Sequence, residues 1–538
     1  MIIMVYFLYL QNMEFALIIN KKQEEIKMKK FLNARRKLTL FLSGVMALSV
    51  LAGCGNSGSG ESAQSTSVVS TGEASASTAD SDKPYEINWY TIGTPQKDIP
   101  TVMAELSKYT EKKINAKVKM TQFDWGEYTD KMNVVINSGE PYDICFTCSW
   151  ANQYIPNVAK GAFLPLDEML QKEGKGILEA VDPVFIEANK VNGKLYAVPT
   201  NKELCPQTRW LFNKDLVEKY KFDISKPLTF EELEPMLKTV KEGEKGMLDV
   251  LLVRNDWNLP RYFDDYEWAG TNQIPLVVPM TSKDYKLVNF FEQPDVQKNL
   301  ETMRKYFQAG YVRKDAASST DQDFTKTGKW FVRIGGWLPG ADQIWSRSEK
   351  APVVSTPITG NLYVSQSQLS GSMIAISVSS QNPDKAMQFL NLLNTDKYVR
   401  NMVDSGIENV HYKMENGKQV DLDKAQDYNM PSFSLGNRLI CNLFKDDPDD
   451  LWDQYKKFNA SGTKSPLIGF NANLDNVKKE VAALNNVYAE FYRPIVTGTV
   501  DYKSYLPKYM NKLKENGLDK VGTELQKQID QYKAGKGK

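Results

Sequence analysis

Histidine is nearly absent from this sequence of 538 residues. His411 is the only one, which excludes a two-histidine H-E-x-x-H zinc site and leaves any Ser-His-Asp triad dependent on that residue alone. The sequence also lacks a G-x-S-x-G nucleophile elbow and a G-x-x-x-x-G-K-[ST] phosphate loop. These absences argue against a zinc peptidase, a serine hydrolase and a P-loop enzyme. They do not exclude a glycosidase, which needs only two carboxylates.

Cysteine is scarce as well, with five residues unevenly spaced, so a disulfide framework is not expected. Cys145 and Cys148 form a C-x-x-C, but the preceding residues read as a buried strand, where an odd offset sends side chains to opposite faces. We therefore expect a structural role for this pair and no thioredoxin-like redox chemistry.

The N-terminal apolar run is too short to cross a bilayer. Leu38 to Ala52 spans about fifteen residues, against the roughly twenty that a membrane helix needs. Basic residues and no acidic residue precede it from Met28 onward, and it ends in Leu51-Ala52-Gly53-Cys54. This order predicts a lipoprotein signal peptide over residues 28–53, with Cys54 as lipid attachment site and mature N-terminus. Residues 1–27 are interpreted as an artefact of an upstream start.

Positive charge is not in excess after this leader. The formal net charge of +1, less five leader cations, gives −4 for residues 54–538, which favours no nucleic-acid partner. Residues 54–83 are rich in Ser, Gly and Thr and predict a flexible linker between the lipid and a folded body.

The folded body begins with an alternation of strand and helix patterns. Strands are predicted at 86–90, 116–122 and 142–146, with helices at 99–113 and 128–138. This order predicts a mainly parallel sheet covered on both faces. Ligands bind such sheets beyond the carboxyl ends of the strands, which points to residues 90–94 and 147–150.

Five motifs occur along the folded body. They are Phe163-Leu164-Pro165-Leu166, Asn192-Gly193-Lys194-Leu195-Tyr196-Ala197-Val198-Pro199, Trp210-Leu211-Phe212-Asn213-Lys214-Asp215-Leu216, Pro227-Leu228-Thr229-Phe230-Glu231-Glu232-Leu233 and Ser377-Val378-Ser379-Ser380-Gln381-Asn382-Pro383-Asp384-Lys385-Ala386. In their order and spacing these motifs resemble family 1 extracellular solute-binding proteins of ABC importers, with Phe212 and Phe230 in place of a tyrosine and a tryptophan of the family pattern. Together with apolar stripes beyond residue 465, the segment Gly406-Ile407-Glu408-Asn409-Val410-His411-Tyr412 resembles the lipoprotein branch of this family, which carries a C-terminal helical domain.

The resemblance implies an α/β, two-lobe periplasmic-binding-protein-like fold of type 2, with a hinge and a C-terminal helical extension. We expect the N-lobe to comprise residues 84–203 and about 358–405, and the C-lobe residues 204–357 and about 406–464. The C-terminal helical domain is expected over residues 465–538, where two apolar stripes recur at helical spacing. Residues 201–207 and 357–372 are the expected hinges.

A carbohydrate site needs flat aromatic rings flanked by polar side chains. Position after a strand suggests Tyr90 and Trp150, and an aromatic and polar loop suggests Asn255 and Trp257. The resemblance adds Glu203 and Trp337 as ligand contacts. The predicted binding residues are thus Tyr90, Trp150, Glu203, Asn255, Trp257 and Trp337, with ordinary core packing as the alternative for each.

The favoured function is a lipid-anchored receptor on the outer face of the cytoplasmic membrane, on a Gram-positive type of cell surface. It would capture a carbohydrate, in particular an oligosaccharide, and deliver it to ABC permease subunits. A tethered glycan-cleaving enzyme, or a binder of a peptide or other solute, remains the alternative. We expect a monomer anchored through Cys54, with no catalytic residue, metal or cofactor.

Overall fold

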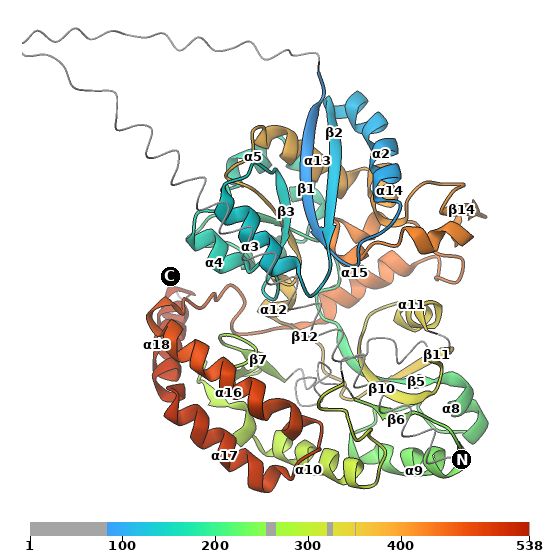
Figure 1. The fold of residues 1–538 in the computed structure, drawn as a ribbon, viewed down its shortest axis with the longest axis vertical. Coiled ribbons are helices and arrows are strands. Elements are labelled where there is room, and N and C mark those ends of the chain that lie inside the picture. The colour runs from blue at the N-terminus through green and yellow to red at the C-terminus, as the bar shows by residue number, and fades with distance from the viewer. Residues whose placement is uncertain (1–82, 254–264, 320–326, 350, 537–538) are drawn as a thin grey trace, which may run out of the picture. The chain divides into compact units, whose positions relative to one another are not determined.

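The computed structural model describes residues 83–253, 265–319, 327–349 and 351–536. The first lobe is built on a five-stranded sheet of order β2-β1-β3-β13-β4 (Figure 1). Strands β1, β2 and β3 are parallel, whereas β13 pairs antiparallel with both β3 and β4, so the sheet is mixed. The strands are β1 (Tyr85–Ile92), β2 (Ala116–Phe123), β3 (Ile144–Thr147), β4 (Ala197–Pro199) and β13 (Met373–Ile376).

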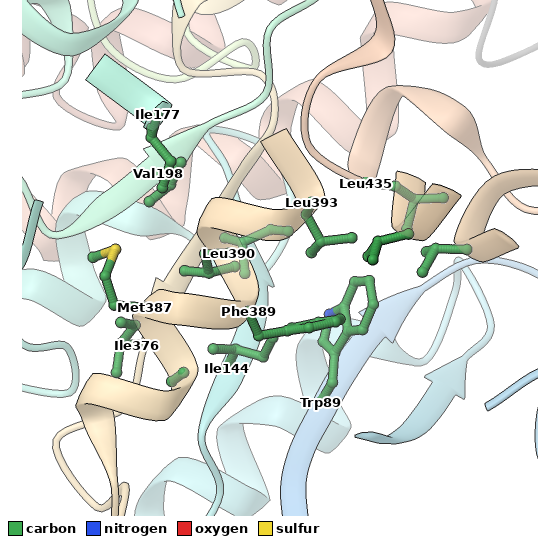
Figure 2. Packing of buried hydrophobic residues seen from close by; sticks show 14 of the residues in the cluster. Trp89, Ile144, Ile177, Val198, Ile376, Met387, Phe389, Leu390, Leu393 and Leu435 are labelled. Carbon is green, nitrogen blue, oxygen red and sulfur yellow. The ribbon is translucent and has the colours of Figure 1, made fainter. Parts of the chain in front are cut away.

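Helices cover both faces of this sheet, as the alternating pattern predicted. Figure 2 shows Trp89 of β1 packed beside Phe389, with ring centroids 5.7 Å apart, in the main core of the lobe. The strand therefore sends Trp89 into the core. The helices of the lobe are α2 (Ile99–Ile114), α3 (Tyr128–Ser138), α4 (Tyr154–Ala159), α5 (Asp167–Lys172), α6 (Lys175–Ala180), α7 (Pro183–Ala188), α13 (Pro383–Thr395) and α14 (Lys397–Ser405).

The second lobe contains a four-stranded sheet of order β11-β5-β10-β6. Its core gathers the aromatic pair Trp210 and Phe230, whose rings stack 5.7 Å apart. Thr229 donates its backbone N–H and its hydroxyl to Glu232, which is the carboxylate half of a capping box. The elements are β5 (Gln207–Asn213), β6 (Asp249–Leu252), β10 (Trp330–Trp337), β11 (Val353–Pro357), α8 (Lys214–Tyr220), α9 (Glu234–Gly243), α10 (Pro294–Gln308) and α11 (Ala341–Ser348).

A third core joins the C-terminal helices to a small sheet from the middle of the chain. The helices are α16 (Lys478–Val496), α17 (Tyr502–Glu515) and α18 (Leu518–Lys536), and the sheet contains β7 (Tyr266–Trp268), β8 (Leu276–Pro279) and β9 (Val288–Asn289). We call this body the C-terminal unit. The two apolar stripes pack in this core, and helix α10 contributes residues both to it and to the second lobe. The predicted helical domain therefore also includes strands that the sequence analysis assigned to the C-lobe.

Residues after 405 correct a second boundary. Tyr428, Met430 and Leu435 are buried in the core of the first lobe, and His411 Nε2 lies 3.3 Å from Asp98 Oδ2 beside α2. The segment from about 406 to 440, which we call the returning segment, therefore belongs with the N-lobe and not with the C-lobe. Its apolar residues are buried against α2 and α14, and nothing local in the sequence specifies which lobe a returning segment will cover.

Two chain crossings between the lobes run side by side. Strand β12 (Tyr363–Val364) pairs in parallel with β16 (Thr463–Lys464), and helices α12 (Gln366–Leu369) and α15 (Leu451–Ser461) flank this ribbon. Near them, the Leu204 N–H donates to the Asn459 side chain, which donates in turn to the Lys202 carbonyl. The crossing at 201–207 is thus fastened to α15.

Candidate functional site

Three aromatic rings gather beyond the carboxyl ends of strands β2 and β3. Trp125 follows β2, Trp150 follows β3, and Phe433 comes from the returning segment. The rings of Trp125 and Trp150 lie 6.4 Å apart at 25°, and Trp125 stacks on Phe433 at 6.1 Å and 19°. We call these three residues the aromatic platform. It lies at the sheet edge where open α/β sheets bind ligands.

The two tryptophans of the platform remain open to solvent. Trp125 is 45% exposed and Trp150 is 46% exposed. Tryptophan is usually highly buried, so two exposed and nearly parallel indoles indicate a surface made for contact. The C–H face of a sugar ring fits a flat indole, and polar groups at the ring rim can reach water or flanking side chains.

Hydrogen bonds and a ring contact hold Trp150 and Phe433 of the platform in place. Trp150 donates its indole N–H to the Gly371 carbonyl at 2.9 Å, and the Phe146 ring lies 5.7 Å from the Trp150 ring. Ser372 donates its hydroxyl to the Phe433 carbonyl at 2.8 Å. These contacts tie the platform to the segment between α12 and β13. A pre-organised surface of this kind loses little entropy when a ligand binds.

Trp337, at the end of β10 in the second lobe, is already in contact with two side chains. The Arg209 guanidinium lies over its ring at 3.6 Å from the centroid, and Phe458 of α15 meets it edge to face at 5.6 Å. Its indole N–H donates to Asp342. Trp337 therefore links β5, β10 and α15. A sugar could use the ring face under Arg209 only if the guanidinium moved.

Arg209 is itself partly buried, and this burial lowers its pKa to about 10, although Asp342 opposes the shift. The guanidinium remains protonated at neutral pH. It donates to Gln207 at 2.8 Å and lies 3.4 Å from the Ser355 hydroxyl. A guanidinium with several N–H donors beside an indole is suited to sugar hydroxyls. Nothing in the local sequence singled out Arg209.

Glu203 lies between two cations at the crossing. Its carboxylate oxygens are 3.6 Å from Lys202 Nζ and 3.5 Å from Arg438 Nη1, and the side chain is 13% exposed. Burial favours the neutral acid, but the two cations outweigh it and lower the pKa of Glu203. The residue is therefore an ionised partner of buried cations, with little surface left for a ligand.

Tyr90 is packed rather than exposed. Its ring stacks on Phe123 at 5.5 Å and meets Tyr142 edge to face at 5.7 Å. Burial, reinforced by Glu140, raises the pKa of the Tyr90 hydroxyl. Tyr90 thus belongs to the partly buried layer that also holds Phe433. Asn255, Trp257 and Cys54 lie outside the described residues.

The aromatic platform was only partly visible in the sequence. Trp125 follows β2 just as Trp150 follows β3, so the same rule could have selected both residues. Phe433 carries no such signal, because it reaches the platform from a segment nearly three hundred residues further along the chain. The structure thus groups Trp150 with Trp125 and Phe433, which the sequence analysis did not name.

The described residues offer little reactive chemistry around this surface. Burial raises the pKa of the Cys145 and Cys148 thiols to about 12 each. The prediction that their side chains point to opposite faces was wrong, because both residues belong to one core cluster. Among the described residues, no three His, Cys, Asp or Glu side chains are arranged to hold a metal ion. The described helices include none with the length and hydropathy of a membrane span.

Comparison with known proteins identifies the family. The model for "Bacterial extracellular solute-binding protein" matches residues 105–425, and "Domain of unknown function (DUF3502)" matches residues 466–534. A "Carbohydrate ABC transporter substrate-binding protein" of Streptococcus pneumoniae serotype 4 is 33% identical over 505 residues, covering 92% of this chain and 98% of that protein. The chain belongs to the bacterial extracellular solute-binding proteins, and the predicted two-lobe fold is confirmed.

Two further likenesses bear on function. The "N-glycan transport solute binding protein (NgtS)" of Streptococcus pneumoniae is 34% identical, with a TM-score of 0.77 over 84% of this chain and 99% of that one. Its complex with Man5GlcNAc gives a TM-score of 0.71 at 34% identity, over 84% and 98%. "Lipoprotein LipO" of Bacillus subtilis is 24% identical over 490 residues, covering 82% of this chain and 90% of that protein.

Proposed function

We propose that this protein is the receptor of an ABC importer and that it captures an oligosaccharide between its two lobes. The observation that carries the proposal is the aromatic platform, a pre-formed and exposed stacking surface at the ligand edge of the first sheet. The N-glycan transport relative supports the same ligand class, since it is 34% identical along nearly its whole length. We therefore take an N-glycan with mannose and N-acetylglucosamine units as the first ligand to test.

The platform would supply the stacking contacts and the second lobe the polar ones. Trp125 and Trp150 offer two neighbouring indole faces, enough for adjacent rings of one chain. Arg209 beside Trp337 offers donors for hydroxyl groups across the site. Micromolar capture requires about −8 kcal/mol in total, which a few stacked rings and several charge-assisted hydrogen bonds can supply after the cost of closure.

The proposal also includes the roles predicted for Asn255, Trp257 and Cys54, which lie outside the described residues. Asn255 would add an amide contact and Trp257 an aromatic one. Cys54 would carry the lipid that holds a monomeric receptor on the outer face of the cytoplasmic membrane. The likeness to a lipoprotein of Bacillus subtilis supports the anchor. Its partners would be the membrane permease subunits, and the protein would leave its ligand chemically unchanged.

Isothermal titration of residues 84–538 with Man5GlcNAc tests the proposal, with sucrose and a tripeptide as comparison ligands. We expect a micromolar or tighter Kd for the glycan only, and an unaltered glycan mass after overnight incubation. Shorter glycans or new reducing ends would indicate a glycan-cleaving enzyme. Tight binding of the tripeptide with no glycan binding would indicate another solute.

A further inference from the structure

The ribbon of β12 and β16 ends beside a buried carboxylate from the C-terminal unit. Glu267 of β7 is 2% exposed, and its Oε2 accepts the Gln366 N–H at 2.9 Å. Gln366 lies two residues after β12, at the start of α12. Glu267 therefore binds the crossing that contains β12 where the ribbon ends.

Gln366 extends this contact to the first lobe. Its side-chain amide donates to the Ala188 carbonyl at the end of α7 at 3.0 Å, and its amide oxygen accepts the Gly469 N–H at 2.7 Å. On the other side, β7 belongs to the core of the C-terminal unit, which shares helix α10 with the second lobe. The series of hydrogen bonds from Glu267 through Gln366 to Ala188 thus connects the C-terminal unit with the first lobe.

We propose that Glu267 is a positioning residue, by which the C-terminal unit controls the angle between the lobes and hence the affinity for the oligosaccharide. This inference rests on the proposed function of the cleft. It assigns to the C-terminal unit, which forms no part of the platform, a role in setting the ligand affinity. A lobe movement about the ribbon that stretches or re-aims the Gln366 N–H brings the strength of its hydrogen bond to Glu267 into the free energy of closure.

The charge of Glu267 is poised to change near neutral pH. Burial raises its pKa to about 7, although the hydrogen bond from the Gln366 N–H opposes the shift. Within the described chain Glu267 forms no ion pair, and α12 presents no ionisable side chain to it. The ionisable groups on the described neighbouring elements come from both sides of Glu267. They are Tyr266 on its own strand and Asp265 just before that strand, Tyr363 of β12, exposed Lys464, Glu187 paired with Lys190, and Tyr532 and Lys536, which donate to the Ile468 and Pro466 carbonyls.

The ionised carboxylate holds the Gln366 N–H more tightly than the neutral acid does, because charge-assisted hydrogen bonds are the stronger kind. Moving the lobes should therefore be harder when Glu267 is ionised. We expect oligosaccharide affinity to be about fivefold higher at pH 6 than at pH 8, the difference between breaking a charge-assisted and a neutral hydrogen bond.

The test compares wild type with Glu267→Gln by titration calorimetry with Man5GlcNAc from pH 5.5 to 8.5. The wild-type Kd should follow a one-proton transition near pH 7, and Glu267→Gln should remove it. Glu187→Gln, whose side chain is 67% exposed, is the matched control and should keep the wild-type profile. A transition that persists in Glu267→Gln, or a flat wild-type profile, would overturn the proposal.

Melting temperatures of the unliganded proteins separate this inference from the proposed function. Because burial raises the pKa of Glu267 to about 7, the wild type should lose stability relative to Glu267→Gln as the pH rises from the ordinary carboxyl pKa to about 7. No glycan binding at any pH would overturn the receptor function. Identical melting profiles for the two proteins would overturn the role of Glu267, and a difference in melting without a difference in the Kd profile would reduce Glu267 to a structural residue.

Discussion

Replacing Trp150 with alanine should weaken oligosaccharide binding about tenfold and leave the fold intact. Trp150 is 46% exposed, and a tryptophan presents about 250 Å² in total, so about 115 Å² of its surface faces solvent. A sugar ring that covers half of this area buries about 60 Å². At about 25 cal/mol per Å², the lost contact corresponds to about 1.5 kcal/mol.

The assay is titration calorimetry with Man5GlcNAc, together with the melting temperature of each variant. Trp150→Phe keeps a flat ring but loses the hydrogen bond to Gly371, so it should bind within about threefold of wild type. Tyr398→Ala removes an equally exposed aromatic, 46%, from helix α14 outside the platform and should not change the Kd. An unchanged Kd in Trp150→Ala would refute the stacking role of the platform.

Three further outcomes follow from buried groups. Glu203→Gln should destabilise the protein at neutral pH, because Lys202 loses its buried partner. Since the pKa of Glu203 is lowered on folding, its contribution is present above the ordinary carboxyl pKa and is lost as the pH falls through the folded value, so urea unfolding of wild type and variant should converge in acid. Leu525→Ala should cost about 2–5 kcal/mol in urea unfolding, because Leu525 is fully buried in the C-terminal unit; a loss below 0.5 kcal/mol would contradict that packing. Cys145 and Cys148 should resist a thiol reagent in the native state at pH 8 and react after unfolding, and rapid native labelling would contradict their burial.

Local sequence patterns predicted several helices and strands of the first lobe. The helix over residues 128–138 has the predicted bounds, and the predicted strands at 86–90 and 116–122 lie within β1 and β2. Period and capping are properties of neighbouring residues, so one sequence suffices to read them. The antiparallel strand β13 was not predicted, because its partners β3 and β4 are about two hundred residues away.

The candidate site shows the same limit. Trp150 could be proposed because its position after a strand is a local property. Phe433 and the guanidinium of Arg209 could not, because each becomes relevant only through a ring brought to it by the fold. Glu203 has the right residue type for a sugar contact, yet its sequence neighbour Lys202 and the distant Arg438 engage it. Residue type and spacing identify candidates, and tertiary partners decide which of them stay free.

A crystal structure of the protein with Man5GlcNAc tests the central claim most directly. The account predicts an intact glycan between the lobes, with a sugar ring stacked on Trp125 or Trp150 at about 4 Å from the indole. A glycan bound elsewhere, with the aromatic platform left open to solvent, would contradict the account.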